Sequence, residues 1–190
     1  MDINTQNLNI SILVDLNMTK WELHRVWAVR AGIDEEISRK IDELIDFGRE
    51  YKGFKIGHDW PFGGMGKFTI ACEFIYEDFG SEGVKALILH GALDYMEFLV
   101  RKGYPKEEIY WRILAWIKFC NRKNVIQYIK RLPESERVEW IMSQDFSYNY
   151  IREDIRDYVL AAAKNIMEFV IRNFEDILYS IEKCSEDEKT

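Results

Sequence analysis

The chain has few residues that break helices, and its cysteines do not follow the pattern of a cross-linked protein. Its 190 residues include 3 Pro, 11 Gly and 3 Cys, and no two Cys residues stand in a CxxC pair. An odd number of unpaired Cys argues against a disulfide framework and against a zinc site built from thiolates. We therefore expect a reducing compartment. The scarcity of Pro and Gly favours long helices.

Long apolar runs are also missing. No apolar stretch without a charge reaches the length of about 18 residues that a membrane span needs. The first residues also lack the basic segment that opens a secretory signal. The sequence therefore predicts a cytoplasmic protein with no membrane partner. Apolar residues still make up 47% of the chain and charged residues 31%, which excludes a disordered or collagen-like protein.

Basic residues are outnumbered along most of the chain. There are 26 Lys and Arg against 33 Asp and Glu, and this balance argues against nucleic acid as a partner. The segment 101–131 is the exception, with nine Lys and Arg and two acids. Such a segment either attracts an anionic ligand or pairs with acidic helices of the same chain, and the sequence leaves both interpretations open.

Apolar residues recur with helical spacing along most of the chain. Gly80 separates two such patterns, over about 67–79 and 81–102, and the stripe from 151 to 183 predicts a long C-terminal helix. Residues 1–18 show no clear period. The sequence predicts an all-α fold, a single-domain helical bundle of about seven or eight helices. The domain is expected to span residues 1–184, with a polar tail over 185–190.

The segment 49–66 differs from the rest of the chain because it contains five Gly. It predicts a long Gly-rich loop, and loops of this length within compact domains are usually functional or disordered. Its end, PFGGMGKFT, lacks both the spacing of a P-loop and a preceding strand, which excludes that nucleotide-binding motif. Loop amides and Lys67 at a helix start could still hold an anion.

Other common catalytic patterns are missing. Glu73 and Glu77 stand four residues apart, but no Glu precedes a His by three residues, which excludes a ferritin-like di-iron site. We expect these two carboxylates to form a solvated face. The chain also has no G-x-S-x-G nucleophile elbow, and no Ser stands beside a His.

Only 3 His are present, and their positions favour metal binding. His24 falls within a predicted helix, and His58 is followed directly by Asp59. His90 precedes Asp94 by four residues, which places the two side chains on one helix face. Neutral imidazole and carboxylate are typical ligands of a catalytic divalent metal. Such a metal lowers the pKa of bound water and polarises a phosphoryl oxygen.

The order His, His-Asp, His resembles that of the HD-domain metal-dependent phosphohydrolases, which are all-α. The spacing is 34 residues from His24 to His58 and 32 residues from His58 to His90. The stretch HGALDYMEFLVRKGYPKEEI, which begins at His90, is similar in outline to the H-x-x-G-A … G-x-P-x-E segment of that family. The resemblance covers about residues 21–117, roughly half of the chain.

The resemblance implies a divalent metal ion as cofactor and a metal-bound hydroxide that attacks phosphorus. The implied metal ligands are His24, His58, Asp59, His90 and Asp94, and the implied catalytic residues are Asp59 and Asp94. Asp94 is either a ligand or a group that orients one. The closing Asp ligand stays open among Asp94, Asp145, Asp154 and Asp157.

A small phosphorylated molecule or nucleotide is the substrate that this resemblance implies. We expect its phosphate to be bound by basic residues of the Gly-rich stretch and of the segment 101–131. These residues are Lys67, Arg122 and Lys123.

A second hypothesis is a non-enzymatic all-α interaction protein. Its partner surface would be the long C-terminal helix or the basic segment 101–131, and exposed aromatic side chains leave a homodimer open. The distance between the histidines discriminates between the two hypotheses. Side chains more than about 10 Å apart cannot share one ion, because metal–ligand bonds are about 2 Å long.

Overall fold

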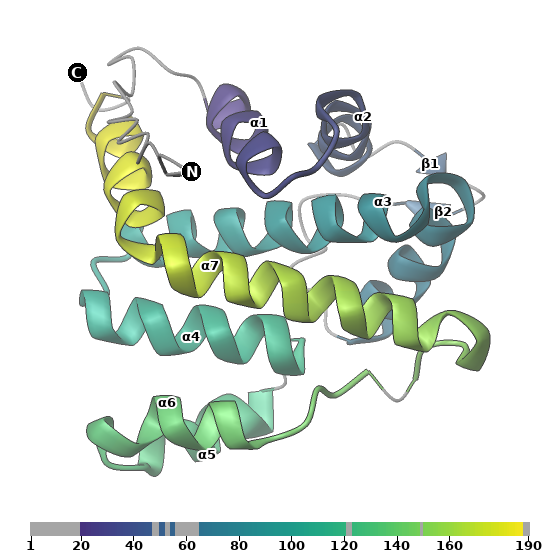
Figure 1. Cartoon of the computed structure of the whole chain (residues 1–190). Coiled ribbons are helices and arrows are strands. Elements are labelled where there is room, and N and C mark those ends of the chain that lie inside the picture. The colour runs from purple at the N-terminus through teal and green to yellow at the C-terminus, as the bar shows by residue number, and fades with distance from the viewer. Residues whose placement is uncertain are drawn as a thin grey trace, which may run out of the picture.

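A computed structural model describes residues 20–46, 50–51, 54–55, 65–120, 123–148 and 150–187. Within these ranges the chain forms seven helices and one short pair of strands (Figure 1). The helices are α1 (Lys20–Arg30), α2 (Glu35–Asp46), α3 (Met65–Arg101), α4 (Lys106–Phe119), α5 (Lys123–Arg131), α6 (Glu134–Ser143) and α7 (Glu153–Asp187). The strands β1 (Glu50–Tyr51) and β2 (Phe54–Lys55) pair in antiparallel fashion. The predicted all-α class is confirmed.

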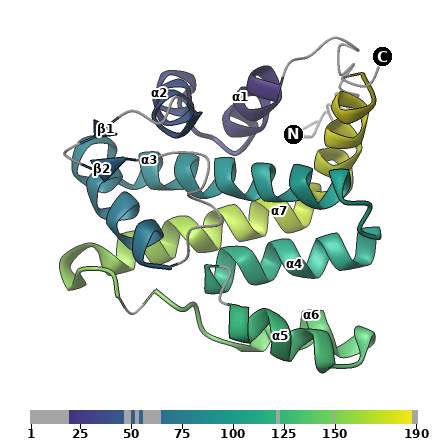
Figure 2. The same cartoon turned by 180° about the vertical axis from the view of Figure 1, so that it is seen from behind.

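Helix α3 is the central element of the described fold. It contacts α1, α2, α4 and α7. Both views show α1 and α2 on one side of α3, with α4 and then α5 and α6 on the other (Figures 1 and 2). Helix α7 runs beside α3, and the apolar stripe predicted for it is buried, including Ile155, Val159, Ile166 and Ile177. The long C-terminal helix predicted from this stripe is present.

The break predicted at Gly80 is a kink inside one long element. Gly80 has φ 61° and ψ −158°, a backbone conformation that L side chains rarely adopt, and the chain is helical on both sides of it. Helix α3 also begins at Met65, within the segment 49–66 that was predicted to be a loop. In the same segment β1 and β2 form regular structure. That loop prediction is therefore wrong at these positions, and residues 56–64 lie outside the described ranges.

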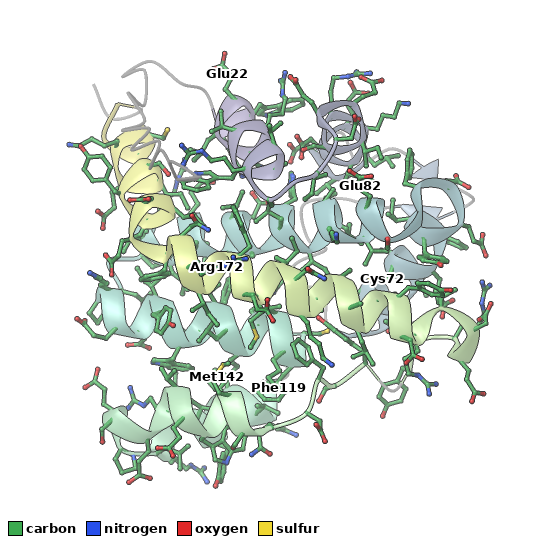
Figure 3. All side chains as sticks on the ribbon, in the orientation of Figure 1. Glu22, Cys72, Glu82, Phe119, Met142 and Arg172 are labelled. Carbon is green, nitrogen blue, oxygen red and sulfur yellow. The ribbon has the colours of Figure 1, made fainter. Side chains whose placement is uncertain are left out.

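Helices α3 and α4 approach each other closely at Gly91, the residue that follows His90. A Cβ atom added at Gly91 would stand 2.5 Å from the ring of Trp116. Glycine at this position therefore lets the buried Trp116 pack directly on the α3 backbone. On the α2 side, the backbone N–H of Asp34 donates to Glu82 Oε1 over 2.7 Å, which ties the start of α2 to α3 (Figure 3).

Several side chains of the basic segment 101–131 pair within the chain. Lys106 lies 2.5 Å from Glu175 of α7, and Arg112 lies 2.5 Å from Glu108. The Lys118 ammonium is buried and donates to the carbonyl of Met142 over 2.9 Å. These contacts match the interpretation that the segment pairs internally.

Two further expectations concern the polar tail and the absence of a membrane span. Residues 1–19 lie outside the described ranges, and α7 continues to Asp187, so the first residues of the predicted polar tail are helical. Within the described ranges, none of the helices combines the length and the apolar character needed to cross a membrane.

Candidate metal centre

A buried cluster of titratable side chains lies where α1, α2 and α3 meet. Each helix contributes two residues four positions apart, a spacing that places both side chains on the same face. The buried cluster consists of Lys20 and His24 from α1, Asp42 and Asp46 from α2, and His90 and Asp94 from α3. Four members, His24, Asp42, His90 and Asp94, are between 2% and 8% exposed. This arrangement is costly unless the charges compensate one another or bind an ion.

Packing of the three helices explains why these polar groups are inside. On α1, Trp27 and Leu23 are buried on the same side as His24, while Glu22 points away from the bundle (Figure 3). On α2, Ile41 and Ile45 are buried, and Asp42 lies between them in sequence. The polar side chains therefore share the apolar faces that hold the helices together, and folding carries them into the core.

His90 stands at the centre of the cluster. Its Nδ1 atom lies 2.7 Å from Asp42 Oδ1 and 3.2 Å from His24 Nδ1. The two imidazole rings meet edge to face, with their centroids 4.5 Å apart. His90 Nδ1 thus has two polar atoms within 3.2 Å, and either of them can accept its proton.

The other nitrogen of His90 faces a second set of carboxylates. His90 Nε2 lies 3.1 Å from Asp94 Oδ2 and 3.7 Å from Asp46 Oδ1. Asp94 also contacts α1, because its Oδ1 atom lies 2.7 Å from Lys20 Nζ and 3.8 Å from His24 Nε2. Both oxygens of Asp94 therefore have a nitrogen neighbour.

The surrounding charges set the protonation of the two imidazoles. Burial alone would lower the pKa of His90, but the charge of Asp94 and hydrogen bonds to Asp42 and Asp46 raise it well above the usual 6.5. Burial and the neighbouring His90 lower the pKa of His24 to about 3. Without a metal ion, His90 is therefore a cation at neutral pH and His24 is neutral.

The carboxylate and the ammonium of the pair Asp94–Lys20 stay charged. Burial would raise the pKa of Asp94, but His90, His24 and Lys20 hold it well below its ordinary value of 3.8. Burial would likewise lower the pKa of Lys20, but Asp94 and Glu97 raise it above 10.5. Lys20 Nζ lies 3.1 Å from Glu97, which in turn lies 2.6 Å from Arg101.

Two groups in this cluster have the composition of a metal site. One consists of His24, Asp42 and His90, and the other of Asp46, His90 and Asp94; within each, the ligand atoms lie within 4.8 Å of one another. Ligand atoms about 2.0–2.2 Å from a shared ion stand about 3–3.5 Å apart, so the 3.2 Å between the two Nδ1 atoms matches. The Oδ2 atom of Asp42 is buried and has no hydrogen-bond partner among the described residues. A cation would satisfy it.

A small cavity borders the cluster on its α7 side. It has a volume of about 10 Å³, and its lining includes Lys20, His24, Glu97 and Cys184. That volume is about the space that one water molecule requires. The cavity therefore offers a place for a single water beside His24.

The structure brings together three of the residues proposed from sequence as metal ligands, His24, His90 and Asp94. His58 and Asp59 lie outside the described residues, so their place relative to the cluster stays a prediction. Of the other candidates for the closing Asp, Asp154 lies 2.7 Å from Arg152 at the start of α7. Asp145 follows α6, whose main helix contacts within the described ranges are with α4 and α5 rather than with the helices of the cluster.

The residues predicted to bind phosphate are not part of the described cluster. Lys67 belongs to the first turn of α3, and its side chain lies outside the described part of the structure, as does Arg122. Lys123 begins α5, which packs on α4 and α6 rather than on the helices of the cluster. A role for these residues in binding phosphate stays a prediction.

The sequence interpretation missed Lys20, Asp42 and Asp46. A signal for Asp42 was present, because this carboxylate stands next to Ile41 and three residues before Ile45 in the apolar stripe of α2. It also did not foresee the contacts of Glu73 and Glu77. Glu73 accepts the backbone N–H of Arg152, and Glu77 pairs with its guanidinium, so these carboxylates, whose contacts with Arg152 are exposed, also hold the start of α7.

Comparisons with known proteins identify no relative of this chain. No protein-family model matches the chain, and searches of curated proteins and of solved structures give no significant match.

Proposed function

We propose that the protein is a metal-dependent hydrolase of small phosphorylated molecules, and that His24, Asp42 and His90 hold its divalent ion. The observation that carries this proposal is the convergence of two imidazole nitrogens and one carboxylate oxygen, 2.7 and 3.2 Å apart, inside the core. Imidazole together with carboxylate is a donor set that suits catalytic first-row metals.

The charges of the cluster support a divalent ion. Without one, Asp94 contacts Lys20, and Asp42 and Asp46 contact protonated His90. Binding an ion at His90 Nδ1 requires the proton there to leave. Exchange of one proton for a divalent ion adds one positive charge to a cluster that contains three carboxylates.

The remaining residues have separate tasks in this proposal. When bound, a divalent ion lowers the pKa of a coordinated water and polarises a phosphoryl oxygen. Asp94 Oδ2 lies 3.1 Å from His90 Nε2, where its charge would orient the ring, as carboxylates behind metal-binding imidazoles do. The cavity beside His24 has room for one water, and of the three proposed ligands only His24 lines it. In the proposed hydrolysis, attack of a water on phosphorus would break the bond to the leaving oxygen, which would take up the proton that the water loses.

Hydrolysis of a chromogenic phosphomonoester or phosphodiester by the metal-loaded protein tests the proposal. We expect Asp42→Asn to lower the rate by about 100-fold, because the ion loses a ligand. Asp176→Asn, which changes an exposed carboxylate on α7, serves as the matched control and should leave the rate unchanged. Equal rates for the wild type and Asp42→Asn, or no metal-stimulated hydrolysis at all, would contradict the proposal.

The alternative, a non-enzymatic interaction protein, has less support. The apolar stripe of α7 packs inside the bundle, so it does not offer the partner surface that the sequence suggested. The exposed aromatic side chains on α7, Tyr158 and Tyr179, lie 21 positions apart and form no continuous apolar patch by themselves.

A further inference from the structure

The ammonium of Lys20 contacts a member of one of the two possible metal groups, the group of Asp46, His90 and Asp94. Its Nζ atom lies 2.7 Å from Asp94 Oδ1, at the first residue of α1. Glu97 lies 3.1 Å from the same ammonium and pairs with Arg101 over 2.6 Å. This row of alternating charges keeps the Lys20 side chain, which is 30% exposed, directed toward the 7%-exposed Asp94 side chain.

The two metal groups compete because they share His90. In one group His90 contributes Nδ1, and in the other it contributes Nε2. The carboxylates of the two groups differ in their surroundings. Asp94 has a nitrogen neighbour at each oxygen, and one of these is the Lys20 ammonium, whereas Asp42 contacts His90. Buried side-chain atoms without a hydrogen-bond partner among the described residues occur in both groups, among them Asp42 Oδ2 in one and His90 Nε2 in the other.

We propose that Lys20 is a specificity-determining residue that directs a divalent ion to His24, Asp42 and His90 rather than to Asp46, His90 and Asp94. This inference rests on the metal site of the proposed function. The fixed positive charge of Lys20 neutralises Asp94 and repels a second cation there. Among the described residues Asp42 contacts His90, which is itself a ligand in both groups, so no further cation competes there with the incoming ion.

Removal of the Lys20 charge should move the ion from the first group, His24, Asp42 and His90, to the second, Asp46, His90 and Asp94. Titration with Co²⁺ measures affinity, and X-ray absorption of the bound Co²⁺ counts imidazole ligands. The preferred group supplies two imidazoles, from His24 and His90, and the other group supplies only one. We therefore expect the imidazole count to fall by one in Lys20→Met.

Variants that belong to one group only give an independent readout. In the wild type, His24→Gln should weaken Co²⁺ binding at least about tenfold and Asp46→Asn less than about threefold. In the Lys20→Met background the two effects should be exchanged. Lys40→Met is the matched control, because Lys40 is an exposed lysine that pairs with Glu36 over 3.5 Å, and it should leave the wild-type pattern intact.

The outcomes separate this inference from the proposed function. If the wild type binds no Co²⁺, the proposed metal site fails. If the wild type binds Co²⁺ and the dependence on His24 and Asp46 is the same with and without Lys20, the metal site stands and the role of Lys20 is overturned. Thermal unfolding of each variant establishes that it is folded, and the imidazole count in Lys20→Met decides the question even where a double variant does not fold.

Discussion

His90 Nδ1 lies 2.7 Å from Asp42 Oδ1, so α3 and α2 are joined by a buried charge-assisted contact rather than by apolar packing alone. Only 2% of His90 and 3% of Asp42 is exposed. Partners of opposite charge that are both buried depend on each other, because loss of one leaves the other charged in a medium that solvates it poorly.

Removal of one partner should therefore be costly. We predict that Asp42→Ala destabilises the protein by about 3–5 kcal/mol, because His90 keeps its position and loses a carboxylate. Urea unfolding followed by circular dichroism measures this change. The double variant Asp42→Leu/His90→Leu should recover part of the loss, since it removes both charges. A loss below about 1 kcal/mol for Asp42→Ala would show that the contact contributes little.

Metal binding should release a proton. The pKa of His90 is raised well above 6.5, so this imidazole is protonated at neutral pH and must become neutral to bind an ion through Nδ1. Calorimetric titration in two buffers with different ionisation enthalpies should show release of about one proton per ion, and affinity should rise with pH. Heats that are independent of the buffer would contradict this prediction.

His24 should lower the free energy of unfolding as the pH falls below about 6.5. Its pKa is lowered to about 3 in the folded state, whereas an unfolded histidine has a pKa near 6.5. Between these values the unfolded chain binds more protons, so stability falls as pH decreases, by about 1.4 kcal/mol per pH unit for one group. Urea unfolding between pH 6.5 and 4 should show a steeper slope for the wild type than for His24→Gln. Equal slopes would show that His24 titrates normally.

The close approach at Gly91 should matter for both fold and site. A Cβ atom there would lie 2.5 Å from the rigid ring of Trp116, so Gly91→Ala must push α3 and α4 apart. We expect a loss of about 1–3 kcal/mol in unfolding free energy. Because His90 is the neighbouring residue, Co²⁺ affinity should fall as well. Gly103→Ala provides a contrast, since a Cβ there meets nothing within 4 Å and only its φ of 72° is strained.

Periodicity predicted the helical class well, because long helices leave a repeated apolar pattern. The stripe that ends at Ile181 and the break at Gly80 both have local causes in the sequence, and both are found. The start of α3 at Met65 was missed because Gly63, Gly64 and Gly66 made the local sequence look like a loop. Local composition did not indicate that a helix would continue through Gly66.

The site was predictable only in part. His24, His90 and Asp94 were identified because histidines are few and the spacing of His90 and Asp94 is informative. The position of Asp42 in the apolar stripe of α2 indicated burial, but its contact with His90 depends on how α2 packs on α3, which the sequence of α2 does not show. Lys20 could not be assigned either, since an N-terminal helix lysine usually faces solvent and becomes a partner of Asp94 only through packing.

The metal content of the purified protein tests the central claim most directly. After loading with Co²⁺ or Zn²⁺ and removal of excess ion, elemental analysis of the wild type should find about one ion per chain. Asp42→Asn should retain far less, and Asp176→Asn should match the wild type. A wild-type protein that retains no ion, or an Asp42→Asn variant that retains as much as the wild type, would contradict the assignment of His24, Asp42 and His90 as a metal centre.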